Sequence, residues 1–176
     1  MKNLKNLLLI AVFILGMGSV ASAQKIAHID FSKVVASMPE MQVLNKDLEK
    51  IEKTWKDELQ GMEKKLQDKY TKYTAESKAQ TDAINEKRAL EIQEDQKRLS
   101  QSNQMAQNDI QQKMNDGLAP IVEKARKAIQ EIADAKGITY VIDSSKGILI
   151  AFDKGEDLFP LVKTKLGLVE LPAPKK

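Results

Sequence analysis

The chain contains no cysteine and a single histidine, His28, among its 176 residues. Disulfides, thiol nucleophiles and metal sites built on cysteine or on two histidines are therefore excluded. The eight glycines are scattered, and none precedes a Lys-Ser or Lys-Thr pair at the spacing of a phosphate-binding loop. These absences argue against catalysis and nucleotide-driven action, so we expect no enzymatic activity, no metal and no cofactor.

Aromatic residues are also scarce: one Trp, three Tyr and four Phe, against 30% charged residues. Such a chain has little material for a large core, which favours assembly as a source of stability. Its charge is nearly balanced, because without Lys2 and Lys5 the 28 basic residues become 26, against 25 acidic ones. Balanced charge removes the electrostatic attraction that nucleic-acid binding requires, so we expect no nucleic-acid partner.

The first 23 residues have the layout of a secretory signal peptide. Lys2 and Lys5 precede an apolar run over residues 7–20, and Ala21-Ser22-Ala23 is a small-residue cleavage site. The run is shorter than the roughly 20 residues of a membrane span, so an uncleaved anchor is the less favoured alternative. We therefore predict cleavage near Ala23 and a soluble, exported mature chain.

Residues 39–136 predict two long helices that fold back on each other. Apolar residues recur about every 3.6 positions in the first helix, at Leu44, Leu48, Ile51, Trp55, Leu59, Met62, Leu66, Tyr70 and Tyr73. Ser37 and Glu40 fit a capping box at its start. The turn is expected within residues 71–81, and the return helix from Asp82 to Lys136, with a kink near Gly117 and Pro120. The distal part is poor in apolar residues and should pack loosely.

Short apolar segments flank this hairpin on both sides. Residues 25–31 alternate as a strand, followed by a short helical turn over residues 32–37. Residues 138–142 and 148–152 predict a β-hairpin around residues 143–147, and Asp157 is expected to cap a last helix that ends at Gly167. The predicted fold is α+β: a small β-strand body with a long antiparallel helical arm. We divide the chain into signal peptide 1–23, body 24–38 and 137–176, and arm 39–136.

Two aspartates near strand ends, Asp30 and Asp143, invite an acid–base pairing, but turn and cap roles explain both more simply. Apolar arm residues with little local core could pack within the arm or bind unfolded chains. We take the following as candidates for that binding: Trp55, Leu59, Met62, Leu66, Tyr70, Tyr73, Leu90, Ile92, Leu99 and Met105. The candidates for subunit contact in the body are Ile26, Ile29, Phe31, Tyr140, Ile142, Leu149 and Phe152.

The segments 25–30, 138–143 and 157–167, with the charged hairpin between them, resemble the Skp (OmpH) family of periplasmic chaperones. The resemblance implies a jellyfish-like homotrimer whose three arms enclose a cavity and hold unfolded outer-membrane proteins without ATP. It also implies contact of cationic arm tips with lipopolysaccharide or anionic lipid, which the near-neutral mature charge argues against. Many relatives carry Asp-Ile-Thr before the last helix, where this chain has Asp157-Leu158-Phe159-Pro160.

A structural periplasmic coiled coil that links envelope components is the alternative reading of the same pattern. It would have a single fixed partner, whereas a holding chaperone would capture many unfolded chains. Strands of outer-membrane proteins alternate apolar and polar residues and aggregate through their edges, so many weak contacts on a polar arm would suit them.

Overall fold

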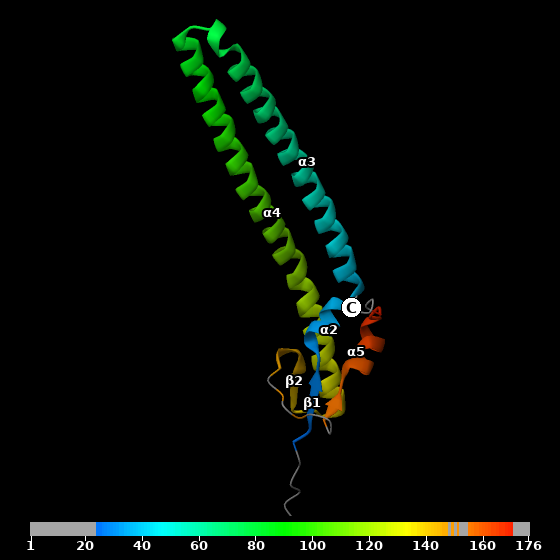
Figure 1. Ribbon diagram of the computed structural model, residues 1–176. Coiled ribbons are helices and arrows are strands. Elements are labelled where there is room, and N and C mark those ends of the chain that lie inside the picture. Colours follow the sequence, from blue (N-terminus) through cyan, green and yellow to red (C-terminus); the bar gives the residue numbers. More distant parts are fainter. Residues whose placement is uncertain (1–23, 148, 150, 152–154, 171–176) are drawn as a thin grey trace, which may run out of the picture.

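The structure, a computed structural model, describes residues 24–147, 149, 151 and 155–170, so the expected signal peptide lies outside the described residues. It consists of a long helical hairpin that projects from a small body (Figure 1). Helix α3 (Pro39–Glu76) runs outward, a 3-10 turn η1 (Ser77–Ala79) reverses the chain, and helix α4 (Asp82–Lys136) returns. At 1.5 Å per residue, the 38 residues of α3 span about 57 Å.

The ends of the return helix follow the sequence closely. Thr81 is the N-cap of α4, and its side chain accepts a hydrogen bond from the backbone N–H of Ile84. Gly137 ends the helix with a left-handed φ of 62°, which a residue without Cβ adopts at no steric cost. The predicted turn within residues 71–81 is confirmed but narrower than its window, because α3 continues to Glu76.

The capping box predicted for Ser37 and Glu40 is wrong. The N-cap of α3 is Met38, without a side-chain hydrogen bond, and Pro39 is the first helical residue. Ser37 instead closes the preceding helix α2 (Phe31–Ala36), where its backbone N–H bonds to the carbonyls of Lys33 and Val34. Because only Ser37 and Met38 separate the two helices, Ser37 is the C-cap of α2 and Met38 is the N-cap of α3.

Helix α4 continues through Gly117 and Pro120, where a kink was expected. The glycine has a packing role there, because a Cβ at Gly117 would overlap the end of the Leu44 side chain. The absence of a side chain lets α3 approach α4 closely where the arm meets the body.

The body contains a three-stranded sheet in the order β2-β1-β3. Both β2 (Tyr140–Asp143) and β3 (Glu156–Asp157) pair with β1 (Ile26–Ile29) in parallel. Parallel neighbours require a crossover connection, and between β1 and β2 that connection contains the whole helical hairpin. A long helical insertion between the first two strands is therefore confirmed.

The β-hairpin predicted from residues 138–142 and 148–152 is not formed among the described residues. β2 takes β1 as its partner, and it is followed by a second 3-10 turn, η2 (Ser144–Lys146). Leu149 and Ala151 lie outside any strand, and residues 148, 150 and 152 lie outside the description. The helical hairpin brings the chain back beside β1, so β2 pairs with a strand that is distant in the sequence.

The core lies in the body, and α5 (Phe159–Leu166) covers part of it. The side chains of Val34, Met38, Leu158 and Val162 are completely buried there, against the last turns of α4. Along the described part of the arm, by contrast, Ala106 is the one buried residue between Leu48 and Ile121. The arm is thus a two-helix projection without an extended dry core of its own. No helix in the described ranges combines the length and apolarity needed to cross a membrane.

Candidate functional site

The distal end of the arm is held together by polar contacts between the two helices. The Tyr73 hydroxyl donates a hydrogen bond of 2.6 Å to Glu91, and Arg88 Nη2 forms an ion pair of 2.6 Å with Glu76. The Arg88 guanidinium also lies 4.5 Å from the centre of the Tyr73 ring. One turn further towards the body, Lys69 pairs with Asp95. These directional pairs fix the register of α3 against α4 where apolar packing is thin.

Two hydrogen-bond donors in this distal cluster, the Tyr73 hydroxyl and Arg88 Nη1, influence what the surface can bind. The hydrogen bond to Glu91 raises the pKa of Tyr73, so its hydroxyl stays protonated and remains a donor at neutral pH. Arg88 Nη1 is buried yet makes no hydrogen bond within the described structure. A buried donor without an acceptor is costly, so this atom favours any ligand that brings an acceptor to it.

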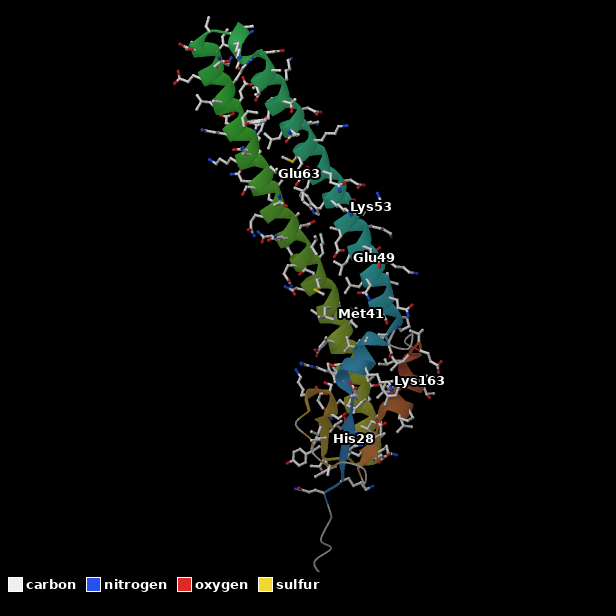
Figure 2. All side chains as sticks on the ribbon, viewed as in Figure 1. His28, Met41, Glu49, Lys53, Glu63 and Lys163 are labelled. Carbon is white, nitrogen blue, oxygen red and sulfur yellow. The ribbon has the colours of Figure 1, made fainter. Side chains whose placement is uncertain are left out.

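The middle of the arm is fixed by one strong polar contact. Trp55 Nε1 on α3 donates a hydrogen bond of 3.0 Å to Asp109 on α4. The indole is therefore anchored across the hairpin, with its ring partly buried between the helices. Figure 2 shows side chains projecting into solvent along both arm helices, with Glu49, Lys53 and Glu63 labelled on α3.

Three shallow hollows lie along the arm between the helices. The proximal hollow, of about 410 Å³, has Trp55, Leu59, Ala106 and Ile110 among its lining residues, the others being polar or charged. The third hollow, of about 460 Å³, is lined mainly by Met62, Leu66, Lys69, Asp95 and Arg98. The distal hollow, of about 500 Å³, is lined mainly by Tyr70, Tyr73, Arg88, Ala89 and Ile92. Each is lined by a mixture of apolar and polar side chains, the usual composition of a binding surface.

Seven of the ten arm residues proposed from the sequence line these hollows. The other three do not: Leu90 and Met105 are exposed, and Leu99 is partly buried. Tyr70, which lines the distal hollow, remains 56% exposed. Sequence reasoning missed Arg88, Ala106 and Ile110. Their part in the hollows depends on the register between α3 and α4, and a turn placed only within residues 71–81 does not define that register.

The body residues proposed for subunit contact fall into two groups. Ile26 and Tyr140 are register partners on neighbouring strands, and they are 51% and 55% exposed. Phe31, Ile142 and Leu149 are partly buried, whereas Ile29 is buried in the chain's own core. Phe152 lies outside the described residues. A hollow of about 430 Å³ opens beside β1 and β2, the strands of Ile26 and Tyr140. Its lining includes Phe31, Ile129, Val141 and Asp143.

The two aspartates at the strand ends have the turn and cap roles that the sequence favoured. Asp30 caps α2 by accepting a 2.8 Å hydrogen bond from the Lys33 backbone N–H. Asp143 accepts from the backbone N–H groups of Phe31 at 3.2 Å and Ser145 at 2.9 Å. Burial acts to raise the pKa of Asp143, but the hydrogen bonds from Ser145 and Phe31 outweigh it, and the pKa is lowered. An ionised cap is not poised for proton transfer.

The geometry offers no metal centre in the parts of the chain that are described, because no cluster of three His, Asp or Glu residues occurs there. His28 lies within β1, labelled in Figure 2 at the base of the body. The features that remain as a candidate site are therefore the hollows of the arm and the exposed part of the sheet.

Comparisons with known proteins point to one family. A family model described as outer membrane protein (OmpH-like) matches residues 25–166. The protein named chaperone protein Skp of Pectobacterium atrosepticum is 25% identical over 133 residues, covering 76% of this chain and 81% of the relative. Its namesake in Yersinia enterocolitica is 27% identical over 135 residues, covering 74% and 82%.

A solved structure has the same fold. The crystal structure of an outer membrane chaperone (OmpH-like) from Caulobacter crescentus superposes with a TM-score of 0.72, covering 88% of this chain and 92% of that one. At 15% identity, this likeness concerns the fold alone.

Proposed function

Because the chain belongs to the OmpH-like outer membrane protein family, we propose that it is an ATP-independent periplasmic holdase. In this proposal it binds unfolded outer-membrane proteins between helical arms and prevents their aggregation. The name chaperone carried by its relatives supports this, and it agrees with our prediction that the chain is not an enzyme.

The observation that carries the proposal is an arm that is long, polar and almost without a core. Ala106 is the one buried residue between Leu48 and Ile121 among the described residues, and apolar side chains line three hollows that open to solvent. A helical pair that buried its own apolar residues would leave fewer of them in such hollows. Shallow hollows of mixed polarity supply weak, exchangeable contacts, and several of them together hold a chain by raising its effective concentration.

We further propose that three chains assemble through the body, so that their arms surround one client. The exposed pair Ile26 and Tyr140, with the partly buried Ile142 on the same face of the sheet, forms an apolar region that a second copy would cover. Release needs no fuel in this scheme, because the barrel that the client forms in the membrane is more stable than the held state. The signal peptide proposed for residues 1–23 would place the mature chain in the periplasm.

The alternative of a structural coiled coil linking envelope layers lacks an observation of its own in the structure. Contact with lipopolysaccharide or anionic lipid is also weakly supported, because the basic and acidic residues of the mature chain nearly balance. Near the tip, Lys69 and Arg88 pair with Asp95 and Glu76, which leaves, among the described residues there, the exposed Lys72, Lys78 and Lys87 as the cations free to meet such a surface. Paired charges attract an anionic surface less than free ones.

The proposal is tested by light scattering of a urea-denatured porin diluted into buffer with the mature chain, Gln24–Lys176. The parent should suppress aggregation without ATP. A variant in which residues 71–91 are replaced by a short Gly-Ser turn should keep the same number of chains in its oligomer and should remain helical by circular dichroism. It should lose most of the suppression of aggregation. Full suppression by that variant would show that the distal part of the arm does not hold the client, and no suppression by the parent would refute the holdase itself.

A further inference from the structure

The proximal and distal hollows are built from equivalent positions of the two helices. On α3, Trp55 and Lys56 of the proximal hollow correspond to Tyr73 and Thr74 of the distal one, each pair 18 residues apart. On α4 the offset is again 18, since Asn103, Ala106, Gln107 and Ile110 correspond to Asn85, Arg88, Ala89 and Ile92. Both helices therefore repeat the same hollow after the same number of residues.

Eighteen residues of α-helix make five full turns, so equivalent residues point in the same direction. The two hollows consequently open on the same side of the arm, about 27 Å apart along its axis. The third hollow opens on the other side. Its Lys65 lies nine residues, or two and a half turns, from both Lys56 and Thr74, and its Arg98 lies nine residues from both Gln107 and Ala89.

The 27 Å spacing matches an extended chain. A β-strand rises about 3.3–3.4 Å per residue, so eight residues span about 27 Å. Because eight is even, the side chains at the two ends of that span lie on the same face of the strand. A membrane-spanning β-strand is about 9–11 residues long and alternates apolar and polar residues, so one such strand is long enough to fill both hollows.

The chemistry of the hollows also favours a peptide. The rims carry side-chain amides, Asn103 and Gln107 at the proximal hollow and Asn85 and Gln93 at the distal one. The buried Nη1 of Arg88 has no acceptor among the described residues. Glu76 already balances the charge of Arg88, so a neutral carbonyl oxygen suits this donor better than a second anion.

Resting on the proposed function, we propose that one side of the arm is a two-point binding site for an extended amphipathic segment. The segment lies along the arm with apolar side chains eight residues apart in the proximal and distal hollows. The bound unit is thus about one transmembrane β-strand per arm, and the other side of the arm does not take part.

The test uses fluorescence anisotropy with two labelled thirteen-residue peptides of identical composition. In the first, two Phe residues stand eight positions apart in a Ser, Thr and Gln background; in the second, they stand seven apart and so on opposite faces. The mature chain should bind the first peptide about tenfold more tightly, since one more buried side chain contributes roughly 1.4 kcal/mol or more. Equal affinities for the two peptides would overturn the proposal.

Three matched variants locate the site. Gln107→Trp and Ala89→Trp place a bulky ring at equivalent exposed rim positions of the proximal and distal hollows, and each should abolish the tenfold preference. Arg98→Trp, nine residues from both, places the same ring on the other side and should leave the preference unchanged. Circular dichroism confirms that each variant is folded. Loss of the preference in Arg98→Trp, or its persistence in either of the other two variants, would overturn the proposal.

Two further readouts separate the possible failures. If the side of the arm instead bound a second copy of the chain, Gln107→Trp and Ala89→Trp would change the oligomeric mass of the protein, which would also overturn the proposal. If the parent suppresses porin aggregation while the peptides show no preference, the two-point site fails and the holdase function stands. If the parent does not suppress aggregation, the proposed function itself fails.

Discussion

At the scale of single residues, the chain uses its few special side chains for structure. Asp30 and Asp143 cap turns, Gly117 admits the Leu44 side chain, and Trp55 is tied across the arm to Asp109. Asp30, Asp143 and Gly117 have structural roles alone, whereas Trp55 also lines the proximal hollow. In the proposed function, binding falls to apolar residues that the arm buries incompletely, of which Tyr70 is the most exposed aromatic in the arm.

Asp143 provides the prediction that belongs to this scale. Its lowered folded-state pKa means that the carboxylate stabilises the fold above about pH 4, and that this contribution is lost as the pH falls through the folded pKa. Asp143→Ala should therefore lower the free energy of unfolding by about 1–3 kcal/mol at pH 7, through the loss of its hydrogen bonds. Urea unfolding at pH 7 and at pH 3 should show the difference from the parent shrinking at the lower pH.

Asp68→Ala, on the exposed surface of α3, controls for the loss of a carboxylate as such. This substitution should change the free energy of unfolding only slightly at both pH values. An Asp143→Ala variant that differs from the parent by the same amount at pH 3 and pH 7 would contradict the proposed capping role.

At the scale of the elements, the two glycines of the arm have opposite environments. A Cβ at Gly61 would meet no atom within 4 Å, whereas one at Gly117 would overlap Leu44. Gly61→Ala should therefore raise the free energy of unfolding by about 0.5–1 kcal/mol, because alanine has the higher helix propensity and nothing opposes it.

Gly117→Ala should gain less or nothing, since Leu44 must move to admit the new methyl group. In a Leu44→Ala background that obstruction is gone, and Gly117→Ala should then stabilise as much as Gly61→Ala does. Urea unfolding of the four variants at one protein concentration measures this. Equal stabilisation by both alanines in the parent background would contradict the close approach of the helices at Gly117.

The sequence predicted the elements well where one local pattern determines them. Helical periodicity predicted both arm helices, Asp82 was expected to begin the return helix, and Gly137 and Gly167 end helices with the left-handed φ typical of glycine. Ser37 was misassigned because a serine between two adjacent helices can serve either of them. The β-hairpin was wrong because strand pairing is not local: β2 pairs with β1, more than a hundred residues earlier.

The same distinction applies to the candidate site. Trp55, Leu59, Tyr70 and Tyr73 could be selected from the α3 pattern alone, and they do line hollows. Of the α4 residues that line hollows, only Ile92 was selected; Arg88, Ala106 and Ile110 could not be, because pairing the helices as in Trp55 with Asp109 requires the position of the turn to within a residue. The equivalence of the two hollows emerges only once that register is known.

At the scale of the whole molecule, the proposed function assigns stability and binding to two different regions. The hairpin extends from the body (Figure 1). The body contains the buried core, and polar side chains join the two helices near the tip of the hairpin. A small core with a long projection is expected to need other copies for stability. Assembly through the body would leave every arm free to hold a client.

Native mass spectrometry of the mature chain, alone and after addition of a urea-unfolded porin, tests this division most directly. We predict an assembly of three chains, and with the porin present a complex of three chains with one porin. Cross-links from the porin should fall on the arm helices. A monomeric chain, or a porin that aggregates while the protein stays unbound, would contradict the account.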